Sequence, residues 1–134
     1  MTQILSSVVP QVVPVGFADL AQAADRLPDT VVAAGDTRLE VGGRSGTGFA
    51  DAVRYRATLR TSALLPPLKV EVVVSPWSAG KSEVAIQPVT NLRRLDSLRA
   101  KRFFRAALSI LPVLVDHLLA GAPAEAPAVL ELAA

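Results

Sequence analysis

The sequence predicts an α+β fold in which a curved antiparallel sheet packs on one long C-terminal helix. Residues 95–119 are the only long stretch with helical periodicity. Residues 31–90 instead hold short segments of alternating apolar and polar character separated by turn residues, which is typical of antiparallel strands. Such a sheet has one apolar face that needs a cover, and the C-terminal helix is the only element large enough to provide it.

The predicted C-terminal helix has a wide apolar face. With about 100° between successive residues, this face covers an arc of roughly 180°. Pro112 cannot donate to the carbonyl of Leu108, so we expect a kink or a break there. Gly121 followed by Pro123 predicts the end of the helix. The apolar face comprises Phe103, Phe104, Ala107, Leu108, Leu111, Leu114, Val115, Leu118 and Leu119.

The first part of the chain predicts a strand followed by a short helix. Residues 4–15 are rich in β-branched side chains, and Pro10 and Pro14 favour an edge position or a bulge. Residues 17–27 have apolar side chains at helical spacing, and Pro28 ends this helix.

Five more strands are expected before the long helix. Their ranges are 30–34 and 37–41, joined by a two-residue turn, then 49–60, 68–75 and 84–87. The connections are expected at residues 42–46, which read GGRSG, at 62–67 with its two prolines, and at 76–80.

The alternation of residue types also predicts which side chains face solvent. Arg54, Arg56 and Arg60 share one face of their strand, and Glu71 and Glu83 on the next two strands face the same way. Opposite charges across antiparallel strands favour the register by roughly 0.2–1 kcal/mol a pair.

Length and composition fit one ordinary domain, expected over residues 1–120 and followed by an Ala/Pro-rich tail over residues 121–134. The chain of 134 residues is 51% apolar and 19% charged, with a formal net charge of +2. That charge is too small to indicate a polyanion partner on its own. No uninterrupted run of about 18 apolar residues occurs, so we expect no transmembrane segment. With no signal peptide indicated, a cytoplasmic protein is the default expectation.

Few residues have the pattern of a catalytic or metal site. The chain has no cysteine and a single histidine, His117, so neither a thiolate site nor a multi-histidine metal site is expected. The segment GGRSGTG, residues 42–48, lacks the lysine and the following helix of a phosphate-binding loop. The predicted inner face carries no acid or base, which disfavours an enzyme of the cyclase or hydratase kind. We expect no cofactor and no metal.

Taken together, the segments resemble the START-like superfamily (SRPBCC), which includes polyketide cyclases, plant pathogenesis-related allergens and lipid-transfer domains. The resemblance is in the order of elements over nearly the whole chain. It is carried by the opening ILSSVVPQVV, the hairpin segments VRYRATLRT and LKVEVVVSPWSAGKSEVAIQPV, and the final LDSLRAKRFFRAALSILPVLVDHLL. It implies a helix-grip fold and a hydrophobic small molecule bound between sheet and helix.

Our first functional hypothesis is therefore non-enzymatic binding of a hydrophobic small molecule or lipid. The inner faces of sheet and helix predict the ligand-binding residues Tyr55, Leu59, Val70, Val72, Ile86, Phe104, Leu111 and Leu118. If no cavity exists, these residues form only a core.

The alternative hypothesis is an interaction protein, either a homodimer or a subunit that recognises an acidic partner, anionic lipid or nucleic acid. It rests on a basic group at the start of the long helix, where positive charge opposes the helix dipole. A simple solvated face explains the same residues. The group consists of Arg93, Arg94, Arg99, Lys101, Arg102 and Arg105.

Overall fold

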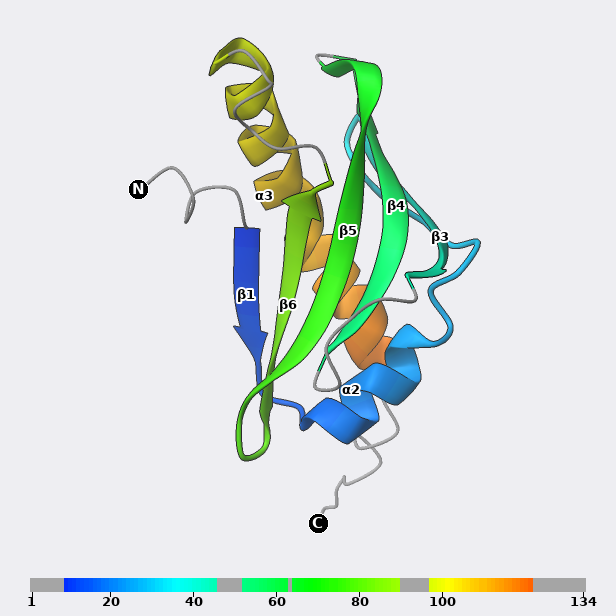
Figure 1. The fold of residues 1–134 in the computed structure, drawn as a ribbon, viewed down its shortest axis with the longest axis vertical. Helices are drawn as coiled ribbons and strands as arrows, with labels where there is room; N and C mark the ends of the chain where they lie inside the picture. Colours follow the sequence, from blue (N-terminus) through cyan, green and yellow to red (C-terminus); the bar gives the residue numbers. More distant parts are fainter. Residues whose placement is uncertain (1–8, 46–51, 63, 90–96, 122–134) are drawn as a thin grey trace.

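The fold is α+β, with a six-stranded antiparallel sheet wrapped around one long helix (Figure 1). This computed structural model describes residues 9–45, 52–62, 64–89 and 97–121. The helices are α2 (Phe17–Ala24) and α3 (Ser97–Gly121). The strands are β1 (Val9–Val13), β2 (Val31–Ala34), β3 (Thr37–Ser45), β4 (Val53–Thr61), β5 (Leu64–Ser78) and β6 (Lys81–Pro88).

The strand order is β1-β6-β5-β4-β3-β2, and all neighbours are antiparallel. Strand β1 therefore forms one edge of the sheet, beside β6, and β2 forms the other edge. Pro10 lies on edge strand β1, as predicted, where its missing N–H removes no central ladder bond. Irregular registers in the β3–β4, β4–β5 and β5–β6 pairs bend the strands and increase their twist.

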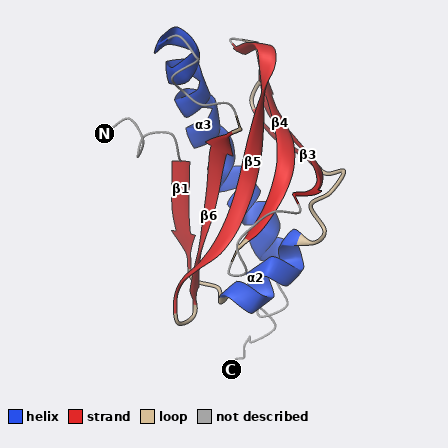
Figure 2. Ribbon diagram, viewed as in Figure 1, coloured by secondary structure: helices blue, strands red, loops and turns tan. Residues whose placement is uncertain are grey.

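Helix α3 crosses the concave face of the sheet, and α2 lies at one end beside the C-terminal end of α3 (Figures 1 and 2). This arrangement is the helix-grip fold expected from the sequence. The inner residues of all six strands and the inner face of α3 form one hydrophobic cluster. Phe103, Ile110 and Leu114 are fully buried in it.

The long helix continues through Pro112 without a break, and the predicted kink there stays a prediction. Pro112 is exposed, so the carbonyl of Leu108 that it leaves without an intrahelical donor is on the solvent side. Leu108 itself is 62% exposed, and the prediction that it faces the sheet was wrong because it lies at the margin of the apolar arc. Ile110, absent from the predicted face, is buried instead.

Parts of all three predicted connections belong to strands. Strand β3 continues through Gly42, Gly43 and Arg44 to Ser45, because a bulge takes the extra residue without ending the strand. Strand β5 includes Pro66, Pro67 and Pro76, since its ends lie at irregular registers that need fewer ladder bonds. The two-residue turn between β2 and β3 was predicted correctly, with Gly35 in the left-handed region at φ 62°.

Helix α3 also has the length and composition of a membrane-crossing segment, with a mean hydropathy of 1.6 over its most apolar window. Of that window, 44% is buried inside the fold. A core helix shares this composition, so the expectation of no transmembrane segment stays a prediction.

Candidate functional site

The side chains predicted to bind a ligand lie together in the hydrophobic core. Tyr55, Val72 and Ile86 occupy paired register positions on three neighbouring strands, so they form one row across the inner face. Leu59 and Val70 lie on the same face and are both 0% exposed. On α3, Leu111 and Leu118 belong to the same cluster and Phe104 packs against it, so the structure brings the whole predicted set to one interface.

From α3, Leu111 and Leu118 are buried, and Phe104 is partly buried against the cluster. The ring of Phe104 meets that of Phe103 edge-on, with 5.1 Å between the ring centroids. These side chains fill the space between helix and sheet. Whether they also hold a ligand stays a prediction.

One polar cluster borders this interface. Tyr55 is 1% exposed, and its hydroxyl donates a hydrogen bond to Oδ1 of Asp25 at 2.7 Å. The Arg44 guanidinium lies 4.0 Å from the same oxygen. Asp25 and Arg44 are themselves 60% and 58% exposed, so the cluster runs from the core to solvent. It provides one polar end to an otherwise apolar inner layer.

Burial raises the pKa of Tyr55 well above its ordinary value, and the hydrogen bond to Asp25 raises it further because it favours the protonated phenol. The charge of Arg44 opposes this shift. Tyr55 is therefore a neutral hydrogen-bond donor at physiological pH. It is unsuited to act as a base there.

Sequence reasoning missed this polar cluster, because it expected no acid or base on the inner face. The bulge at Gly42 and Gly43 places Arg44 opposite Tyr55, on the inner side of β3. Ser82 is also buried, near the start of β6, and its hydroxyl donates to the carbonyl of Val15 at 2.7 Å. The paired glycines before Arg44 were the one available signal of a register change.

The described residues of the predicted basic group do not all lie on one exposed surface of α3. Arg93 and Arg94 lie outside the described residues. The Arg99 guanidinium donates to the carbonyl of Pro66 at 3.0 Å and so links the first turn of α3 to the start of β5. Arg102 is half-buried. These positions are therefore not one continuous solvated row.

The remaining two members lie on an exposed face of α3. Lys101 and Arg105 point to solvent on the same side of the helix as Leu98 and Leu108. Leu98 and Leu108 are 52% and 62% exposed. Basic and apolar side chains thus share one surface of the helix.

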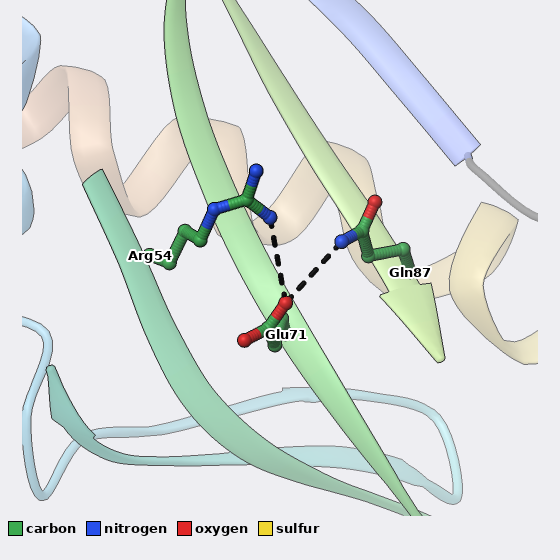
Figure 3. Close-up of polar contacts among 3 residues, drawn as sticks. All are labelled: Arg54, Glu71 and Gln87. Atoms are coloured by element: carbon green, nitrogen blue, oxygen red, sulfur yellow. Dashed lines mark hydrogen bonds and ion pairs between the residues drawn. The ribbon is translucent and has the colours of Figure 1, made fainter. Parts of the chain in front are cut away.

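A pocket formed by described residues lies elsewhere, on the outer face of β3, β4 and β5. Arg54, Glu71 and Gln87 lie on the same outer face (Figure 3). Arg54 and Glu71 confirm the predicted pairing of charges across strands, with 3.5 Å between Nη1 and Oε1.

Comparison with known proteins adds little to this description. No protein-family model and no curated protein matches the chain. Among solved structures, it is similar to DynU16, a protein of the dynemicin biosynthetic locus, at 12% sequence identity and a TM-score of 0.48. The match covers 87% of this chain and 49% of DynU16, so this chain spans about half of that protein's length. A TM-score this low supports no inference about ligand or family, and the helix-grip fold rests on the strand order and helix placement described above.

Proposed function

We propose that this protein is a START-like binding module that holds a hydrophobic small molecule or lipid between the sheet and α3 without catalysing a reaction. The observation that carries the proposal is the continuous apolar layer between one helix and the concave sheet, bordered by the Tyr55 hydroxyl. A ligand pocket of this kind is mostly apolar with a few polar groups that fix orientation.

Binding requires the ligand to take the place of contacts between α3 and the sheet. The inner side chains are nearly all buried, so a ligand must displace part of the helix or of the side chains beneath it. The N-terminal part of α3 is the favoured place for this displacement. There Leu98 is half exposed, and Phe104 is only partly buried against the core.

The polar cluster gives the ligand an orientation. Tyr55 donates its hydroxyl at the inner face, and Arg44 lies beside it with more than half of its side chain exposed. A ligand with one hydroxyl or carbonyl at the end of an apolar body fits this arrangement. Its body contacts the apolar side chains, and its polar end reaches Tyr55 and Arg44. Its polar end replaces or joins Asp25 as the acceptor for Tyr55.

The experiment is native mass spectrometry of gently purified protein, followed by titration with Nile red, an uncharged fluorescent dye. We expect saturable dye binding in the wild type. The substitution Val72→Phe fills the inner face and weakens binding at least about tenfold, at a stability cost of about 1–3 kcal/mol. The control is Val73→Phe on the outer face of the same strand, which leaves binding unchanged.

Circular dichroism first establishes that both variants are folded at the temperature of the titration. The absence of both a co-purifying ligand and saturable dye binding would overturn the proposal. Equal weakening by the inner and outer substitutions would also overturn it, because the dye would then not distinguish the two faces.

A second candidate function is docking on an anionic lipid surface, supported by exposed Leu98 and Leu108 beside Lys101 and Arg105. Basic residues with neighbouring apolar side chains suit the membrane interface. The test is co-sedimentation with phosphatidylserine-containing vesicles at low and high salt. Salt-sensitive binding that Lys101→Gln/Arg105→Gln removes supports it. No binding at low salt refutes it, and binding to DNA or a stable homodimer instead favours the other forms of the interaction hypothesis.

A further inference from the structure

A pocket of about 750 Å³ opens on the outer face of the sheet. Its side walls are formed by Glu40 on β3, Arg56 and Thr58 on β4, and Lys69 and Glu71 on β5. These side chains alternate with the core residues of their strands, so they point away from α3. The pocket is therefore separate from the candidate site of the inner face. Its volume lies within the range of small-molecule sites.

The floor of the pocket is formed by a glycine bulge. Val41 pairs with Ala57 and Arg44 pairs with Tyr55, so Gly42 and Gly43 lie together opposite the single residue Arg56. A β-carbon added at Gly43 would meet no atom within 4 Å. Two successive residues without side chains thus leave bare backbone beside Arg56. Residues at a bulge also lie outside the regular ladder of backbone hydrogen bonds, and bulges are often found next to active sites.

The charges around the pocket are unequally paired. Glu71 accepts from Arg54 at 3.5 Å and from the Gln87 amide at 3.2 Å (Figure 3). Glu40 accepts from the Arg60 guanidinium at 2.9 Å. Both carboxylates of the pocket are therefore already bound to arginines that flank it.

Two cations of the pocket have no carboxylate partner in the described part of the chain. Lys69 donates to the neutral hydroxyl of Thr58 at 3.3 Å. Arg56 forms no ion pair with the described carboxylates. They lie on neighbouring strands, two residues apart in register and on the same face, because Lys69 pairs with Thr58 and Glu71 pairs with Arg56. A pocket that exposes two such cations favours an anion.

We infer that this outer pocket binds a small organic carboxylate. The guanidinium of Arg56 offers the planar pair of donors that fits a carboxylate, and Lys69 adds a second positive charge. The bare backbone of Gly42 and Gly43 admits the body of the ligand. Val89, which is 59% exposed and lines the same pocket, gives that body an apolar contact.

The test is a titration of isotope-labelled protein with benzoate, followed by amide NMR. We expect saturable shifts at Gly42, Gly43 and Arg56 that weaken with added salt. Arg56→Gln should weaken benzoate binding at least about tenfold, because a charge-assisted hydrogen-bonded pair is lost. The matched control is Arg38→Gln, which removes an exposed arginine from β3 outside the pocket and should change affinity less than about twofold.

A second variant fills the pocket and leaves its charges in place. Because a side chain at Gly43 has open space, Gly43→Val should fold normally and abolish benzoate binding. Absence of saturable shifts would overturn the inference, as would equal losses from the Arg56 and Arg38 substitutions. Tighter binding of inorganic phosphate than of benzoate would overturn the assignment to carboxylates. Binding of uncharged Nile red at the inner face is measured separately, so the proposals for the two sites succeed or fail independently.

Discussion

Tyr55 is the one tyrosine of the sequence, so ultraviolet absorbance of phenolate reports its protonation directly. Its pKa is raised in the folded state by burial and by donation to Asp25, whereas an unfolded tyrosine titrates near pH 10. The folded state therefore keeps a proton that the unfolded state loses. This residue contributes stability that is fully present below about pH 10 and falls as the pH rises above that value.

We expect no phenolate absorbance at about pH 10 while circular dichroism shows the protein folded, with ionisation only on alkaline unfolding. The control is the same titration in denaturant, where Tyr55 should ionise with the ordinary pKa of tyrosine, near 10. Half-ionisation near pH 10 in folded protein would contradict the buried hydrogen bond to Asp25.

The pattern of residue types predicted well which face of the sheet a side chain lies on, but it predicted contacts between individual side chains poorly. The alternation in β4 and β5 correctly placed Tyr55 and Val72 on one face and Arg54 and Glu71 on the other. Arg44 was missed because a bulge of one residue moves every later side chain of a strand to the opposite face. Asp25 was missed because its role depends on a tyrosine thirty positions along the chain.

Helix α3 carries an exposed proline whose removal is expected to stabilise the protein. Pro112→Ala restores an N–H that donates to the carbonyl of Leu108, and alanine favours a helix interior over proline by up to about 3 kcal/mol. We expect a gain of about 1–3 kcal/mol in the free energy of unfolding, measured with urea. Ser109→Ala on the neighbouring exposed surface is the control, with a gain of at most about 0.5 kcal/mol. A loss of stability in Pro112→Ala would instead mean that the helix needs proline to follow the sheet.

The packing of the two helices is testable because the chain has no natural cysteine. A β-carbon at Gly121 would lie 3.8 Å from that of Ala23, which is the separation of a disulfide. The double variant Ala23→Cys/Gly121→Cys should oxidise to an intramolecular disulfide. For a loop of this length, we expect it to raise the free energy of unfolding by about 2–4 kcal/mol.

The control is the same variant kept reduced, which should have nearly the stability of the wild type. Mass spectrometry and free-thiol titration measure bond formation. Thiols that stay free under mild oxidation would show that the end of α3 does not pack on α2.

For the whole molecule, the order of elements and the wrapping of a sheet around the last helix followed from periodicity alone. Periodicity identifies which side of each element is apolar, and those sides must meet. It does not tell whether the space between them is filled, because that depends on the fit of individual side-chain volumes. The outer pocket was not predictable for a similar reason. It depends on which arginines pair with Glu40 and Glu71 and on the register of the glycine bulge.

We propose that a hydrophobic ligand binds between the sheet and α3. The most direct measurement is methyl NMR of the protein with dodecanol, a neutral ligand that the cations of the outer pocket do not favour. We expect nuclear Overhauser effects between the alkyl chain and the methyl groups of Val72, Leu111 and Leu118. Effects confined to exposed Leu98 and Leu108, or none at saturating dodecanol, would contradict it.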